Sequence, residues 1–176
     1  MMKRFTFFSL VLVCTFVSCK KSNSSGYHVN ATIGGKGKAF NFIEPVGLIE
    51  KTGQAITSLV ITGILDTAAG EAIQIQLSCG TDKGIVPGAY VDTATDCVMQ
   101  VIYSSDKDHE YYAGTTIAGW AESSNITLKN HLKIVITSID DKSVKGTLGG
   151  DIFLDGDVST TAVTMTNGDF YAQVDQ

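Results

Sequence analysis

The alternation that decides the fold runs through Glu71-Ala72-Ile73-Gln74-Ile75-Gln76-Leu77-Ser78. Its two isoleucines and its leucine fall on one side of an extended chain, and its two glutamines fall on the other. A period of two residues is typical of a β-strand with one buried face, whereas an amphipathic helix repeats every 3.6 residues. The segment therefore predicts a strand with an apolar inner face and a polar outer face.

Similar segments occur on both sides of this one, and none between them keeps a helical period. His131–Ile139 alternates in the same way. Further runs rich in β-branched and aromatic residues are Tyr27–Ile33, Ala39–Ile43, Ile56–Leu65, Val98–Ser104, Tyr111–Trp120, Val144–Leu154, Thr160–Thr166 and Asp169–Val174. Turn signals such as Pro87-Gly88 separate the runs, and a helical turn fits only around Ala118–Ser124. We expect an all-β fold, a single antiparallel β-sandwich or flattened β-barrel of about nine to ten strands.

Length and charge narrow the class of protein. The chain has 176 residues, with 13 basic and 18 acidic side chains and a net charge of −5. This length favours one domain with a substantial core. A protein that binds nucleic acid would carry a basic stripe, so the composition argues against that class.

The first residues read as an export signal. Two basic residues, Lys3 and Arg4, precede an apolar run that ends at Val17 and is too short to cross a bilayer, which needs about 20 residues. The following Phe16-Val17-Ser18-Cys19 resembles a bacterial lipoprotein box, which implies cleavage before Cys19 and acylation of its thiol. The alternative is an ordinary signal peptide that is cut elsewhere and leaves Cys19 as a free thiol. We expect a signal peptide over 1–18, a lipidated flexible tether over 19–26 and a β domain over 27–176. Cleavage removes two basic residues and no acid, so the net charge falls to −7.

Two cysteines remain in the β domain after Cys14 is removed and Cys19 is lipidated. Cys79 and Cys97 lie 18 positions apart. In an exported protein such a pair predicts a disulfide. The alternative is two unpaired buried thiols.

Four segments resemble the small all-β lipoproteins of unknown function from Bacteroidetes. They are Ala31-Thr32-Ile33-Gly34-Gly35-Lys36-Gly37-Lys38-Ala39-Phe40, Gly84-Ile85-Val86-Pro87-Gly88-Ala89-Tyr90, Ile134–Ile139 leading to Val144–Leu148, and Met165-Thr166-Asn167-Gly168-Asp169-Phe170. The second is similar to that family's Gly-x-Tyr turn and the last to its closing Asn-Gly-x-Phe strand. The resemblance implies a lipid-anchored β domain and brings no catalytic or ligand-binding residues with it.

The sequence contains no catalytic, metal-binding or cofactor-binding motif. His28, His109 and His131 are isolated, and the acids form no known metal-binding loop. The nucleophile elbow Gly-x-Ser-x-Gly is missing from the sequence. We therefore predict no catalytic residue, no metal ligand and no cofactor.

Aromatic residues offer the one candidate binding surface. Tyr111, Tyr112 and Trp120 stand close together in the sequence, and exposed aromatic rings beside polar groups bind sugars or proteins. The alternative is that these rings alternate into the core. Two short matches to an envelope O-glycosylation motif, at Thr67 and Thr93, are a weaker hypothesis.

Together these features favour a lipid-anchored envelope protein that is not an enzyme but a binding or assembly module. Its partners would be the membrane, through the acyl chains, and an envelope protein, a glycan or a small apolar ligand. The alternatives are a lipocalin-like carrier with an internal pocket and a hydrolase with two facing carboxylates. Lys20 and Lys21 after the lipidated cysteine favour the periplasmic side of the outer membrane over surface exposure.

Lipidation makes a direct prediction about Cys19. Radiolabelled palmitate should enter the wild-type protein and should not enter Cys19→Ala, because the acylated thiol is then missing. The measurement is autoradiography of the protein after separation on a gel. Equal label in both proteins would end the lipoprotein hypothesis.

Overall fold

The computed structural model describes residues 26–94 and 96–175, and within them the chain is almost entirely β-structure. Eleven strands join into one sheet, and a single short helix interrupts them. The predicted signal peptide, Cys19 and the tether before residue 26 lie outside the described residues. The expected all-β fold is confirmed.

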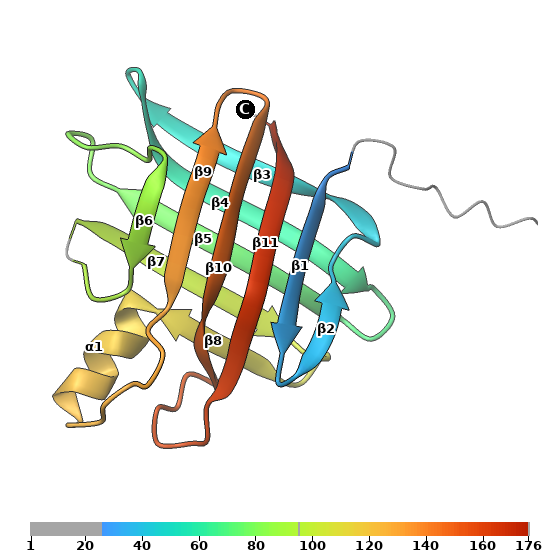
Figure 1. Cartoon of the computed structure of the whole chain (residues 1–176), viewed down its shortest axis with the longest axis vertical. Coiled ribbons are helices and arrows are strands. Elements are labelled where there is room, and N and C mark those ends of the chain that lie inside the picture. The colour runs from blue at the N-terminus through green and yellow to red at the C-terminus, as the bar shows by residue number, and fades with distance from the viewer. Residues whose placement is uncertain (1–25, 95, 176) are drawn as a thin grey trace, which may run out of the picture.

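The strands form two layers packed face to face (Figure 1). The first layer contains β6 (Gly88–Val91), β9 (Lys133–Ile139), β10 (Ser143–Leu154), β11 (Val163–Asp175), β1 (His28–Ile33) and β2 (Lys36–Ala39). The second contains β3 (Ile43–Thr52), β4 (Ala55–Asp66), β5 (Glu71–Cys79), β7 (Cys97–Ser104) and β8 (Glu110–Gly114). Helix α1 (Thr115–Ser123) follows β8 directly, at the end of the second layer.

Two strands of the first layer also pair with the second, so the sheet closes into a ring. β10 pairs with β9 as far as Gly149 and then with β8 at Phe153 and Leu154. The change of partner follows Gly150, whose φ of 153° is open to glycine and strained for other residues. A Cβ there would also lie 2.7 Å from the Leu132 Cα atom, so the corner requires glycine. At the other joint β11 pairs in parallel with β3 through Gln173–Asp175.

The space between the layers is filled by side chains. Ile61, Ile75 and Val101 from the second layer are at most 1% exposed. They belong to the same buried cluster as Ile134 and Phe170 of the first layer. The alternation predicted for the segment from Glu71 to Ser78 is confirmed, because its inward residues are buried and its glutamines are not.

A partly buried ion pair ties the two layers together at one end. Glu71 on β5 accepts hydrogen bonds from the Lys38 ammonium of β2 at 2.5 Å and from the Tyr103 hydroxyl of β7 at 2.7 Å. Burial and the hydrogen bond to Glu71 both raise the pKa of Tyr103. Three strands from both layers therefore share one buried carboxylate.

Several predicted elements differ from the structure. The sequence predicts one strand over Tyr111–Trp120, but β8 ends at Gly114 and the remaining residues belong to α1. The helical turn predicted over Ala118–Ser124 covers only the second half of this helix. The expected strands include only Ile43 of β3 and nothing of β6, whose first residue belongs to the Pro87-Gly88 pair that reads as a turn. Thr160–Thr166 and Asp169–Val174 contribute to one long strand, β11. The pairing of β11 with β3 is parallel, where an antiparallel fold was expected.

The predicted disulfide is present. Cys79 on β5 and Cys97 on β7 lie directly opposite each other in the ladder, and their Cα atoms are 4.2 Å apart. The bond thus joins neighbouring strands of the second layer at the end where β7 begins. The 18 residues of sequence separation include all of β6.

Loss of this disulfide should destabilise the fold without changing it. The chain-entropy model gives a loop of this size about 3 kcal/mol of stabilisation, so the reductant dithiothreitol should lower the free energy of unfolding in urea by a similar amount. The control is the double variant Cys79→Ala/Cys97→Ala, whose stability should not respond to dithiothreitol. An equal response of variant and wild type would mean that the reductant acts elsewhere.

Candidate functional site

The three aromatic residues singled out in the sequence lie on different sides of the sheet. Tyr111 points inward, and its ring lies 5.8 Å from that of the buried Tyr103. Tyr112, the next residue, points outward, and its hydroxyl donates a hydrogen bond to Glu110. Trp120 on α1 is 53% exposed. The structure thus brings Tyr112 and Trp120 to the surface and places Tyr111 against the core.

Tyr112 and Trp120 come together around one glycine. A Cβ added to Gly156, in the loop after β10, would lie 3.5 Å from Trp120 Cζ3 and 3.9 Å from Tyr112 Cβ. The two aromatic side chains therefore border the same small residue. We call these two side chains the aromatic pair, and both lie beside Gly156 at one edge of the second layer.

Helix α1 begins at Thr115 because β8 ends at Gly114. Gly114 has a φ of 135°, and a Cβ there would lie 2.1 Å from the Met99 carbonyl oxygen. The hydroxyl of Thr115 then accepts the hydrogen bond of the Met99 amide at 3.1 Å, where a further strand residue would have paired. Ile117 and Ala121, one helical turn apart, are buried and hold α1 against the sheet.

The outer surface of the second layer carries no charged side chain over the central rows of its three middle strands, and the exposed Asp66 lies at the end of β4. We call this surface the uncharged face. It consists of the outward residues Ser58, Val60 and Thr62 on β4, Gln74, Gln76 and Ser78 on β5, and Val98, Gln100 and Ile102 on β7. Tyr112 of the aromatic pair continues one of its rows, beside Ile102 on the neighbouring strand.

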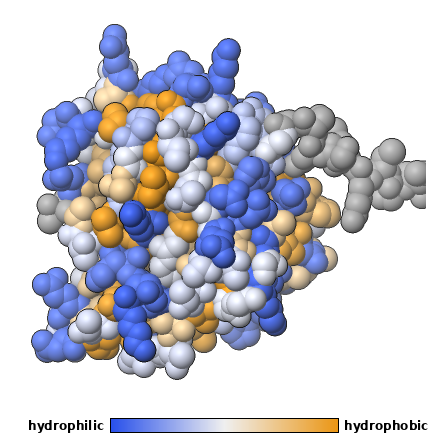
Figure 2. Space-filling model, in the orientation of Figure 1, coloured by the Kyte–Doolittle hydropathy of each residue, from blue (hydrophilic) through white to orange (hydrophobic). Residues whose placement is uncertain are grey.

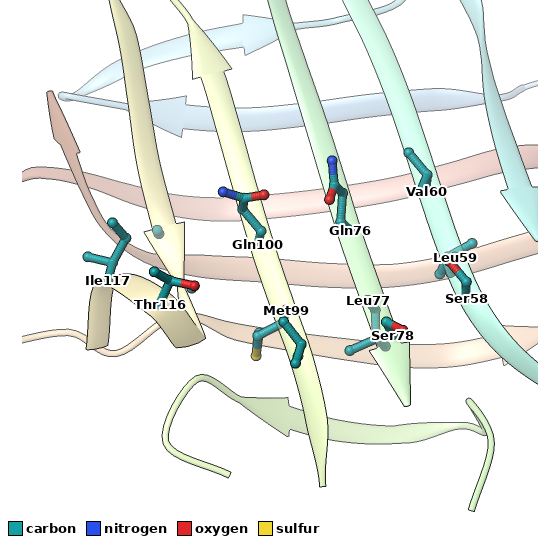
Figure 3. A pocket seen from close by; sticks show the side chains of 13 residues that line it. Ser58, Leu59, Val60, Gln76, Leu77, Ser78, Met99, Gln100, Thr116 and Ile117 are labelled. Carbon is teal, nitrogen blue, oxygen red and sulfur yellow. The ribbon is translucent and has the colours of Figure 1, made fainter. Parts of the chain in front are cut away.

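The strand register arranges these side chains in straight rows. Val60, Gln76 and Gln100 are direct neighbours across β4, β5 and β7 (Figure 3). Ser58, Ser78 and Val98 form the next row. The first row ends at Gly114, which has no side chain, and Thr116 lies beyond it. A shallow hollow of about 130 Å³ results between the two rows and the start of α1.

Most polar groups of the uncharged face have no hydrogen-bond partner within the described chain. The amide of Gln76 donates to the Gln74 carbonyl oxygen at 2.7 Å. No hydrogen bond joins the side chains of Gln100, Ser58 and Ser78 to any other described residue. Their donors and acceptors are directed to solvent and are available to a ligand.

The outer surface of the first layer has a different character. It carries charged groups that pair with one another, and hydrophilic side chains are spread over it (Figure 2). His28 contacts Asp169 at 2.6 Å, and the Lys145 ammonium lies 4.2 Å from the centre of the Tyr171 ring. The absence of charge is therefore a property of one face of the described chain and not of the whole surface.

A second and larger concavity lies on the other side of α1. It has a volume of about 750 Å³ and lies between the helix, the turn after β6 and the segment before β9. Its lining combines small apolar side chains such as Ala118 and Ala121 with Thr115, Glu122 and His131. We call it the helix cleft.

The polar centre of the helix cleft is a pair formed by Asp92 and His131. Asp92 is 3% exposed and accepts hydrogen bonds from the Nδ1 atom of His131 and from the backbone amide of Leu132, both at 2.8 Å. The carboxylate can only accept, so Nδ1 carries a proton and Nε2 is left for solvent or a ligand. Both oxygens of Asp92 are used to fix the start of β9.

The other buried acids are also explained by the fold. Glu71 is bound by Lys38 and Tyr103, and Asp151 accepts hydrogen bonds from Asn130 and Thr164. Among the described residues, no three His, Cys, Asp or Glu side chains are grouped as a metal ion would require. No helix in the described part of the chain has the length and apolar character needed to cross a membrane.

Sequence reasoning missed two parts of this surface. The pairing of Asp92 with His131 joins residues 39 positions apart, and only the contact between β6 and β9 brings them together. The uncharged face was partly visible, because Gln74 and Gln76 alternate with apolar residues. Its extension over β4 and β7 depends on register, which the sequence did not provide.

Comparison of the chain with protein-family models, with curated proteins and with solved structures gives no match. The resemblance to small all-β lipoproteins of Bacteroidetes therefore stays a prediction. The function has to be inferred from the geometry of the uncharged face, the aromatic pair and the helix cleft.

The Asp92–His131 pair makes a stability prediction. Asp92→Ala should lower the free energy of unfolding by about 1–3 kcal/mol, because the buried Leu132 amide loses its acceptor. His131→Ala should cost less, since its side chain is 42% exposed and water can replace it at Asp92. Urea denaturation of both variants measures the difference. A larger loss in His131→Ala than in Asp92→Ala would contradict the assigned roles.

Proposed function

We propose that this protein is a non-catalytic binding module of the bacterial cell envelope. It is held on the outer membrane by acyl chains at Cys19 and binds its partner on the uncharged face. The observation that carries the proposal is the set of amides and hydroxyls on this face that the fold itself does not use. The buried polar side-chain atoms of the described chain have hydrogen-bond partners within it, whereas these amides and hydroxyls face solvent, where a ligand can reach them.

Exposed apolar side chains lie on and beside the same face. Val98 is 60% exposed, and Leu48, which continues the row of Val60 on β3, is 57% exposed. Trp120, in the aromatic pair, is another large exposed side chain. Exposed apolar side chains grouped among polar ones mark interaction sites more often than single scattered ones do.

Two alternatives receive less support from the geometry. A lipocalin-like carrier needs a hollow interior, but side chains from both layers fill the space between them. A hydrolase of the kind considered needs two facing carboxylates, and each buried acid of the described chain hydrogen-bonds to groups that are not acids. A surface-binding module requires neither feature.

The helix cleft is the other candidate site for a ligand. Its buried acid is already explained, because Asp92 fixes the Leu132 amide at the start of β9. The polar groups of the uncharged face have no such role in the fold. We therefore place the binding function on the uncharged face.

Hydroxyl-radical labelling can test this proposal before any ligand is identified. The full chain is labelled in isolated envelopes and, separately, after purification in detergent. Labelling of Leu48 and Val98 should be lower in envelopes, because a bound partner excludes the radical from the face. The internal control is Val135 on β9, an outward valine of the first layer, whose labelling should be the same in both samples.

Two outcomes of the labelling experiment would contradict the proposal. Equal labelling of Leu48 and Val98 in both samples would mean that nothing covers the uncharged face. An equal decrease at Val135 would mean that the envelope shields the whole protein and not one face.

A further inference from the structure

We infer that the ligand of the uncharged face is a neutral carbohydrate. The inference rests on the proposed function and adds the chemical class of the partner. Its basis is the combination of three properties on one flat surface: no charge, unused amides and hydroxyls in rows, and aliphatic side chains between them.

The charge pattern selects an uncharged ligand. The acids around this face stand at its margin: Glu50 on β3 lies beside Ser58, Glu110 on β8 lies beside Ser104, and Asp66 ends β4. No lysine or arginine belongs to the uncharged face or to the lining of its hollow. An anionic polymer would therefore find no cation to pair with, and a basic partner would find only marginal acids.

The hydrogen-bonding groups suit a molecule rich in hydroxyls. An amide offers both a donor and an acceptor, and a hydroxyl group does the same, so they pair in either direction. Gln76 and Gln100 lie side by side on adjacent strands, about 5 Å apart by the usual strand spacing. Gln76 keeps its carbonyl oxygen free while its amide is held by Gln74, which fixes the orientation of the pair.

The aliphatic side chains suit the apolar C–H surfaces of sugar rings. Val60 lies beside Gln76, and Val98 lies beside Ser78, so each row offers both kinds of contact. The hollow of about 130 Å³ beside Gln100 is small and open, as one sugar unit of a chain would need. Tyr112 and Trp120 at the margin supply rings on which a further unit can stack.

A protein partner fits the same surface less well. The centres of protein interfaces are enriched in large aromatic and arginine anchors that enter pockets. Here the face consists of glutamine, serine, threonine, valine and isoleucine, and it contains no aromatic or arginine side chain at its centre. A protein covering this face would have to match each unused amide and hydroxyl or leave it unpaired at a cost.

The test uses the labelling readout with purified full chain and a soluble envelope extract. Periodate cleaves the vicinal diols of sugars, whereas a protease digests proteins. Protection of Leu48 together with Val98, which also borders the helix cleft, should be given by untreated extract, lost after periodate treatment and retained after digestion with protease. It should also persist when the salt concentration is raised, because neither surface carries charge.

The possible results separate this inference from the proposed function. No protection by untreated extract would overturn the proposed function. Protection that survives periodate, or that protease abolishes, would keep the proposed function and reject carbohydrate in favour of another partner. Protection that disappears in high salt would show a charged ligand and reject neutrality.

Two variants connect the readout to the glutamines. Gln76→Ala/Gln100→Ala should need about tenfold more extract for half-maximal protection, because two hydrogen bonds to the ligand are lost. The matched control is Thr137→Ala, an exposed polar residue on β9 in the other layer, which should behave as the wild type. Urea denaturation checks that all proteins remain folded. Equal extract requirements for the double variant and the wild type would overturn the inference.

Discussion

The pairing between β10 and β11 is the constraint on which the rest of the fold depends. The two strands are paired from Ser143 to Ile152, and each then leaves the first layer for the second. β10 reaches β8, and β11 reaches β3, so both edges of the second layer are fixed by the same pair. The second layer thereby has no free edge, whereas β2 and β6 are the terminal strands of the first layer. Gly150 is the residue that permits this at one joint.

Closure of the ring explains why the second layer can present a regular outer surface. Its five strands are held at β3 and β8, and the inner face packs against the first layer, so the outward residues follow the register strictly. The pairing of β5 with β7 has no register shift between the pair Ala72 and Ser104 and the pair Cys79 and Cys97, which forms the disulfide. Rows of matched side chains are the direct result, and the uncharged face is made of these rows.

The sequence predicted the strands with clear alternation and failed where strands change partner or direction. β5 and β9 follow from period-two alternation, and the disulfide follows from export and cysteine number. β6 was not predicted because Pro87-Gly88 indicates a turn. The start of α1 was predicted as a strand because Thr115 and Thr116 are β-branched. The helix forms there because Gly114 ends β8 against the Met99 carbonyl, a tertiary contact that no local pattern contains.

The sequence likewise predicted some residues of the candidate site but not the contacts between them. Trp120 and Tyr112 were identified from the sequence, but they lie close together only because both border Gly156 in the loop after β10. Tyr111 was grouped with them because it is adjacent, yet alternation alone places neighbours on opposite faces, and Tyr111 lies against Tyr103. Asp92 and His131 could not be joined without knowing that β6 pairs with β9.

Glutamine at positions 76 and 100 is not what folding alone would select. A residue on the exposed face of a strand is stabilised most by β-branched or aromatic side chains, which pack against their cross-strand neighbours. Long amide side chains lose more rotamer freedom when they are ordered, and Gln100 receives no hydrogen bond in return from any described residue. The valines beside them show that this face accepts β-branched residues. Stability therefore does not account for the paired glutamines in the middle of the uncharged face, whereas the proposed recognition of a ligand would account for them.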